Sequence, residues 1–126
     1  GLDDPSITPK ENLTLAQEIL SGGGCLVSEY PIHFKATNYT FVERDRIQSG
    51  LSQSVLIMQT TQDGGTMHTY KYAKDQNRII ACYGNNIEGE EFSGNRDIIE
   101  NQPDVVTVKN SKDLDKLFNN QSQTLF

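Results

Sequence analysis

The stretch from Ser54 to Gly84 constrains the fold more than any other part of the chain. It reads as three β-prone runs separated by two turns. Asp63-Gly64-Gly65 forms the first turn signal, because glycine supplies the positive φ that tight hairpin turns require. Asp75 and Asn77 form the second, since their side chains can hydrogen-bond the backbone nearby. The pattern predicts a three-stranded antiparallel meander with strands at 54–60, 66–73 and 78–84.

Alternation along the middle run assigns its two faces. His68, Tyr70 and Tyr72 share one face, because successive side chains of a strand point to opposite sides. The hairpin register places Tyr72 opposite Ile79. This aromatic face is the predicted core face. Residues 55–58 are apolar on both faces, so the first strand is predicted to be central or covered on both sides.

The remaining elements are shorter and more polar. A capping box at 8–11 begins a helix that the glycines at 22–24 end. Asn110 or Ser111 caps a short last helix. Further strands are expected at 25–36, 39–42 and 105–108, a loop or helical turn at 43–50, and a long loop at 85–104 with a helical piece at 97–100.

This order predicts one α+β domain over residues 1–126. Its sheet is mainly antiparallel, and the N-terminal and C-terminal helices pack on one face. The arrangement is similar to cystatin-like and NTF2-like folds, and the similarity is one of element order alone. It implies a pocket between sheet and helix.

Charge and hydropathy exclude two classes of partner. Seventeen acidic residues against eleven basic ones give a net charge of −6, whereas non-specific nucleic-acid binding uses a basic surface to displace counterions. We therefore expect no nucleic-acid partner. No apolar run reaches 18 residues, so no membrane insertion is expected either.

The N-terminus and the cysteines suggest an exported protein. The chain begins with Gly1 rather than Met, as a mature N-terminus would after removal of a signal peptide. Cys25 and Cys82 are its two cysteines, and an even number in a small exported chain predicts a disulfide. The alternative is two buried free thiols. A secreted or periplasmic location is the corresponding expectation.

No catalytic motif, metal site or cofactor site is identified. Cys25 with His33 or His68 could form a thiol–imidazole pair, but Cys25 follows the end of a predicted helix, whereas activation of a thiol favours a helix N-terminus. The two cysteines and two histidines lack zinc-ligand spacing. The acidic run 88–91 lacks the EF-hand pattern and is interpreted as a solvated loop.

The sequence therefore predicts a small exported, non-catalytic binding domain for an unknown protein or small-molecule ligand. The alternative is a small enzyme, or a ligand-binding protein with a pocket between sheet and helix. The long loop 85–104 is expected to take part in binding, because binding residues concentrate on loops held by a rigid sheet. The candidate binding residues are His68, Tyr70, Tyr83, Glu90 and Phe92.

Overall fold

The computed structural model describes residues 7, 9–31 and 34–122. It divides into two compact units, residues 1–44 and 45–126. In the first, a 3-10 helix, η2 (Lys10–Asn12), leads into α1 (Leu13–Ser21). Gly23 follows α1 with φ of 81°, a left-handed conformation that glycine adopts at low cost. Helix α1 thus ends at the predicted glycines. The predicted cap, Thr8, lies outside the described residues.

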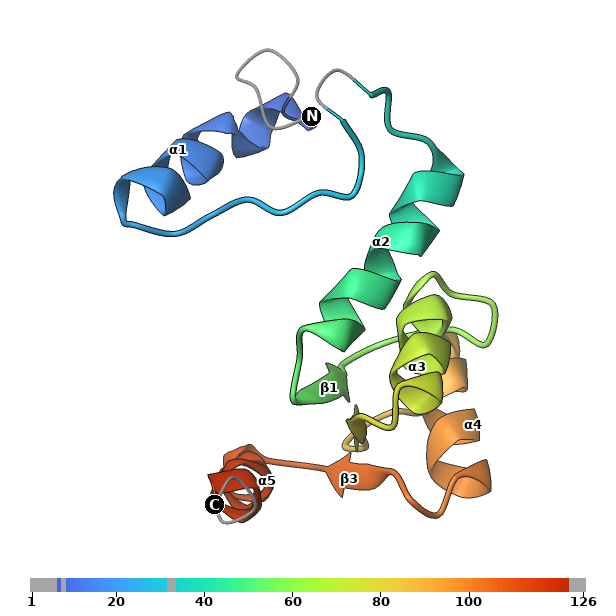
Figure 1. Cartoon of the computed structure of the whole chain (residues 1–126). Coiled ribbons are helices and arrows are strands. Elements are labelled where there is room, and N and C mark those ends of the chain that lie inside the picture. Colours follow the sequence, from blue (N-terminus) through green and yellow to red (C-terminus); the bar gives the residue numbers. More distant parts are fainter. Residues whose placement is uncertain (1–6, 8, 32–33, 123–126) are drawn as a thin grey trace. The chain divides into compact units, whose positions relative to one another are not determined.

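The second unit is built around a parallel sheet (Figure 1). Helix α2 (Asn38–Gly50) leads into it from the first unit. Strands then alternate with helices along the chain, and the three strands pair in the order β1-β2-β3, all parallel. The elements are β1 (Ser54–Ile57), α3 (Thr66–Asp75), β2 (Ile79–Tyr83), η3 (Glu90–Phe92), α4 (Ser93–Asn101), β3 (Val106–Val108) and α5 (Ser111–Ser122).

Helices cover both faces of this sheet. On one face, Ile57 and Cys82 are paired across β1 and β2 and pack with Tyr70 of α3 and Ile98 of α4. On the other face, the buried residues Ala81, Val108 and Leu117 form a second cluster, the last of them from α5. A strand covered on both faces is apolar throughout, which accounts for the continuous Val-Leu-Ile run of β1.

The predicted antiparallel meander is wrong. Its outer strands exist, but they pair in parallel, with Ser54 opposite Ile79. The expected middle strand is helix α3. Met67, Tyr70 and Ala73 recur every three residues and face the core, so the period of the buried positions is helical. The glycines at 64–65 precede this helix rather than closing a hairpin.

Three other segments also differ from the predicted secondary structure. No strand forms in the described part of 25–36, of which residues 32–33 are not described. The expected strand at 39–42 lies within helix α2. Helix α4 occupies half of the expected loop 85–104. The prediction that the helices pack on one face is also wrong, because α3 and α4 contact one face of the sheet and α5 the other.

Gly94 lets the start of α4 approach the segment that follows β1. Its backbone N–H donates to the Thr60 carbonyl at 2.9 Å. A Cβ at this position would lie 2.6 Å from the Thr61 carbonyl oxygen and 2.7 Å from Cγ2 of Thr60. A backbone oxygen cannot rotate away as a flexible side chain can, so the close approach requires glycine here.

We predict that Gly94→Ala destabilises the protein. Alanine favours helix formation by about 1 kcal/mol, but the overlap with the Thr61 carbonyl costs about 1–3 kcal/mol, so the net change is a loss. Gly65→Ala is the matched control, since its φ is −55° and nothing lies within 4 Å of the added Cβ. Urea denaturation measures both variants, and equal stability of the two would contradict the packing argument.

Candidate functional site

The segments that follow the three strands meet at one edge of the sheet. All strands run in the same direction, so their carboxyl ends share an edge, and ligands of parallel sheets bind outside that edge. Residues 58–65 follow β1, residues 84–89 follow β2, and Lys109 and Asn110 follow β3. We call this edge with its three segments the carboxyl edge.

The side chain of Asn95 links the ends of β1 and β2 by hydrogen bonds. Its side chain is fully buried at the start of α4. Nδ2 donates to the carbonyls of Met58 at 3.1 Å and Tyr83 at 3.0 Å. Oδ1 accepts from the backbone N–H of Thr60 at 2.8 Å. One amide thus hydrogen-bonds three backbone groups at the ends of two strands, and the bond to the Thr60 N–H is buried.

Arg96, the next residue, fixes the segment after β2. Its Nη1 donates to the carbonyls of Ile87 at 2.5 Å and Gly89 at 2.7 Å. Asn86, within the same turn, has φ of 53°, a left-handed conformation that asparagine tolerates better than most residues. The turn is therefore held in a defined shape, whereas the sequence predicted a long loop at this position.

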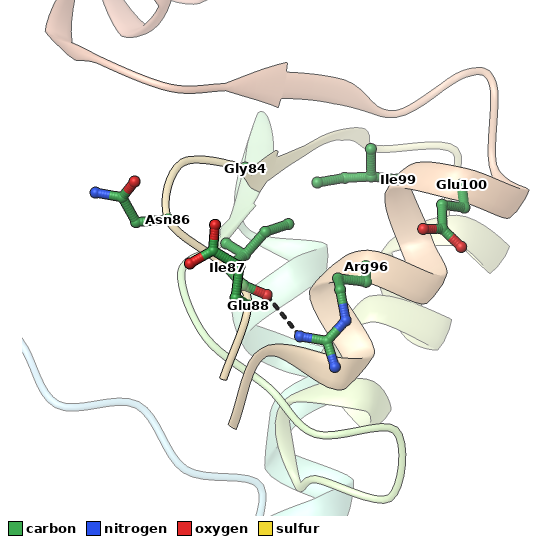
Figure 2. Close-up of a pocket in the computed structure, with 7 residues that line it drawn as sticks. All are labelled: Gly84, Asn86, Ile87, Glu88, Arg96, Ile99 and Glu100. Carbon is green, nitrogen blue, oxygen red and sulfur yellow. Dashed lines mark hydrogen bonds between the residues drawn. The ribbon is translucent and has the colours of Figure 1, made fainter. Parts of the chain in front are cut away.

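A pocket of about 300 Å³ lies between this turn and α4 (Figure 2). Ile87 and Ile99 give it two apolar walls, one from each side, and both are half-buried. Glu88 and Glu100, both exposed, are also among its lining residues. The full lining is Gly84, Asn86, Ile87, Glu88, Arg96, Ile99 and Glu100.

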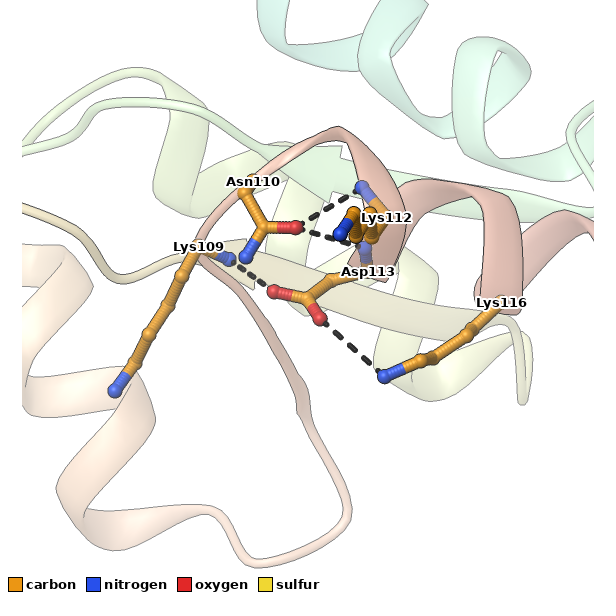
Figure 3. A network of polar contacts seen from close by, with 5 residues as sticks. All are labelled: Lys109, Asn110, Lys112, Asp113 and Lys116. Atoms are coloured by element: carbon orange, nitrogen blue, oxygen red, sulfur yellow. Dashed lines mark hydrogen bonds and ion pairs between the residues drawn. The ribbon is translucent and has the colours of Figure 1, made fainter.

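A cationic turn lies beside the pocket. The backbone N–H of Gly84 in the pocket wall donates to the Val108 carbonyl at 2.9 Å, and Val108 directly precedes Lys109. Lys109, Lys112 and Lys116 are all exposed. We call these three residues the lysine turn; Figure 3 shows their side chains around the start of α5.

Asn110 and Asp113 organise the lysine turn. Oδ1 of Asn110 accepts from the backbone N–H groups of Lys112 at 2.9 Å and Asp113 at 3.3 Å, which caps α5 as the sequence predicted. The Asp113 carboxylate accepts from the Lys109 backbone N–H at 3.0 Å and lies 3.8 Å from Nζ of Lys116. The Asp113 carboxylate therefore has one hydrogen-bond partner and one ionic partner, and the Lys109 side chain extends away from it (Figure 3).

Neither cysteine forms the predicted disulfide. Both are free, with Cys25 exposed and Cys82 buried in the core. Burial raises the pKa of Cys82 from 9.0 to about 11, opposed by a hydrogen bond with Asn95. A raised pKa stabilises the folded state below pH 9, and this contribution is lost as the pH rises towards 11. Cys82 is accordingly a packing residue, not a nucleophile.

The five predicted binding residues lie on different elements. His68 is exposed on α3, whereas Tyr70 of the same helix is buried, and its pKa is raised by burial, then by Asp97 and Cys82. Tyr83 ends β2, half-buried, and η3 contains exposed Glu90 and half-buried Phe92. None of the five lines the pocket. Their role in binding stays a prediction, and His33 lies outside the described residues.

Sequence reasoning missed Asn95, Arg96 and the lysine turn. Asn95 and Arg96 stood in a polar segment expected to be a loop, where no periodicity indicated burial. The available signal of a close backbone approach was Gly94, the second residue of α4. The three lysines were spread over eight residues among two aspartates, so they did not form a recognisable basic run.

Two features are absent from the described residues. No cluster of three or more His, Cys, Asp or Glu side chains there could hold a metal ion. None of the helices in that part of the chain combines the length and apolar character needed to cross a membrane.

Comparison with known proteins identifies the family. The family described as DNA recombination-mediator protein A matches residues 1–119, so the chain belongs to that family. It is 34% identical over 110 residues to the protein Smf of Synechocystis, covering 87% of this chain and 27% of that protein. The chain thus spans about a quarter of this curated relative.

Two solved structures share the fold. The DNA processing protein A structures from Streptococcus pneumoniae and Helicobacter pylori match with TM-scores of 0.75 and 0.76, each at 23% identity over 90% of this chain. They are covered over 38% and 52% of their own chains. The Helicobacter pylori protein is described as having a single-stranded DNA binding mode.

Family membership corrects three expectations. An exported binding domain, a secreted or periplasmic location and the exclusion of nucleic acid are all contradicted, because the family consists of DNA recombination mediators. The first two rested on a missing Met and an even cysteine count, and both thiols are free. The third rested on net charge, which averages over the chain and does not show that three lysines gather at one turn.

We predict that Asn95→Ala lowers the free energy of unfolding by about 2–4 kcal/mol, because it removes three hydrogen bonds to backbone groups at two strand ends. The control is Asn101→Ala, which removes an exposed amide bonded to Asp97 at 2.9 Å on the same helix. Thermal and urea unfolding measure both. A loss below 1 kcal/mol for Asn95→Ala would show that water replaces the amide and that the strand ends do not depend on it.

We also predict that one thiol of the native protein reacts quickly with a thiol reagent at pH 8. Cys25 is exposed, whereas Cys82 is buried and its pKa is about 11. Mass spectrometry should show one adduct on the native protein and two after denaturation without reductant. Failure of both thiols to react after such denaturation would restore the disulfide.

Proposed function

We propose that this chain is the part of a DNA recombination mediator that binds single-stranded DNA at the carboxyl edge of its sheet. Membership in the recombination-mediator family supports a DNA substrate. The Helicobacter pylori relative, whose fold this chain shares, is described as binding single strands. The position agrees with the general rule that ligands of parallel sheets bind outside the carboxyl ends of the strands.

The lysine turn is the observation that carries this proposal. Lys109, Lys112 and Lys116, all exposed, lie around the start of a 12-residue helix, where the helix dipole also favours anions. A phosphodiester backbone bound there releases counterions, which is the main source of affinity for nucleic acid. The pairing of Asp113 with Lys116 and the Lys109 N–H reduces the repulsion of phosphate by its carboxylate.

The net charge of −6 does not prevent this interaction. At physiological salt, charges further apart than about 8 Å are largely screened, so a bound phosphate responds to the groups beside it. At the carboxyl edge Glu88 belongs to the segment after β2, Glu90 and Glu91 begin η3 directly after that segment, and the lysine turn follows β3. The phosphates are expected on the β3 side.

We predict that replacing Lys109, Lys112 and Lys116 by Gln weakens binding of a single-stranded oligonucleotide at least about tenfold at low salt. Each phosphate neutralised on a single strand contributes about 0.7 to the slope of log affinity against log salt, so the slope should fall by about 2. Fluorescence anisotropy over a salt series measures both quantities. Exposed charges contribute little to folding, so the melting temperature should change little.

Lys74→Gln is the matched control. Lys74 lies in the last turn of α3, at the opposite edge of the sheet, where its Nζ donates to Gln102. This change should leave the salt slope unaltered. A triple variant that keeps the affinity and slope of the parent protein would place the DNA elsewhere.

A further inference from the structure

We propose that Asp113 is a positioning residue of the lysine turn, whose carboxylate holds the backbone of Lys109 in the conformation that presents the Lys109 ammonium group to a phosphate. This inference rests on the proposed function and gives an acidic side chain a supporting role within the phosphate site. Charge alone predicts the opposite role, because a carboxylate repels phosphate. Removing the Asp113 carboxylate therefore has opposite expected effects under the two views.

The connection between β3 and α5 is short and is anchored at both ends. It consists of two residues, Lys109 and Asn110. Val108, directly before it, is buried, accepts a hydrogen bond from the Gly84 N–H at 2.9 Å, and packs with Leu117 of α5. Since the neighbouring elements are fixed, the backbone conformation of these two residues decides where the Lys109 side chain points.

Asn110 and Asp113 fix this connection from opposite directions. Oδ1 of Asn110 accepts from the backbone N–H groups of Lys112 at 2.9 Å and Asp113 at 3.3 Å. In return, Oδ2 of Asp113 reaches back to the Lys109 N–H at 3.0 Å. This is a capping box displaced by one residue, since the usual box returns to the N-cap N–H. These three N–H groups are bonded within the protein, so the ammonium groups are left to bind phosphate.

The Asp113 carboxylate contacts the backbone of Lys109 and not its ammonium group. Figure 3 shows the Lys109 side chain extending away from Asp113, and this side chain is exposed. Asp113 also lies 3.8 Å from Nζ of Lys116, whose side chain is 77% exposed, and such an exposed ion pair contributes little. The hydrogen bond to the Lys109 N–H is therefore the contact through which Asp113 acts.

The test compares Asp113→Asn with Asp113→Ala. Both changes remove the same negative charge, but asparagine keeps an oxygen that can accept from the Lys109 N–H. Fluorescence anisotropy measures the binding of a thymine-only single-stranded oligonucleotide at a temperature where circular dichroism shows each variant folded. A merely structural role would lower the melting temperature and leave this affinity unchanged.

We expect Asp113→Asn to bind the strand as tightly as the parent protein or up to about threefold more tightly, because the repulsion of phosphate falls. Asp113→Ala should bind about threefold or more weakly than Asp113→Asn, since binding must then order the turn. Its salt slope should fall by about 0.7, as for one lost phosphate contact. Asp113→Leu keeps the branched shape of asparagine without an acceptor and should behave as Asp113→Ala does.

A double-mutant cycle tests whether Asp113 acts through Lys109. In a Lys109→Gln background, the asparagine and alanine variants at position 113 should bind the strand within about 1.5-fold of each other, because the group that they position is gone. Asp115 provides the matched control, since it is an exposed acid of the same helix. Asp115→Asn and Asp115→Ala should bind the strand equally.

The outcomes separate this inference from the proposed function. Equal affinity of Asp113→Asn and Asp113→Ala, or tighter binding by Asp113→Ala than by the parent protein, overturns the positioning role, while the salt slope of the triple lysine variant still supports DNA binding. A difference that survives Lys109→Gln, or that recurs between the Asp115 variants, also overturns it. Failure of the parent protein to bind the strand overturns both proposals.

Discussion

The buried amide of Asn95 is the interaction on which the carboxyl edge depends. A parallel sheet leaves the backbone groups at its strand ends without partners once the ladder stops, and burial makes such groups costly. Asn95 supplies two donors and one acceptor to the segments after β1 and β2. It can do so because Gly94 brings the start of α4 close to Thr60 and Thr61. The adjacent Arg96 then shapes the next turn from the same helix.

This arrangement divides the electrostatics of the edge into two parts. The segment after β2 is acidic and encloses a small, partly apolar pocket, whereas the turn after β3 carries three lysines. A polymer of alternating charged and uncharged parts suits such a surface, because its phosphates and its bases require opposite environments. The overall acidity of the chain is then compatible with the proposed DNA binding, because the lysines gather at the turn after β3.

The sequence was informative about local structure and uninformative about strand direction. It indicated the segments of β1, β2 and β3, helix α1 and the Asn110 cap, because these depend on apolar runs, glycines and caps. Direction depends on whether a helix or a strand joins β1 to β2. Alternating His68, Tyr70 and Tyr72 favoured a strand, while Met67, Tyr70 and Ala73 fitted a helix equally well. Tertiary packing of Tyr70 and Ala73 against β1 and β2 decided between them.

The residues of the candidate site were harder to predict than the secondary structure, because their partners are far away in the sequence. Asn95 and Arg96 act on backbone groups up to 37 residues away, and no local pattern reports such partners. The sequence also does not distinguish a buried asparagine from an exposed one. Asn95 has its structural role because it is buried beside the ends of two strands. Once α4 is known to be a helix, however, the spacing of Arg96, Ile99 and Glu100 places all three on one face of it. In the structure Arg96 of this face hydrogen-bonds the turn after β2, and all three residues line the pocket.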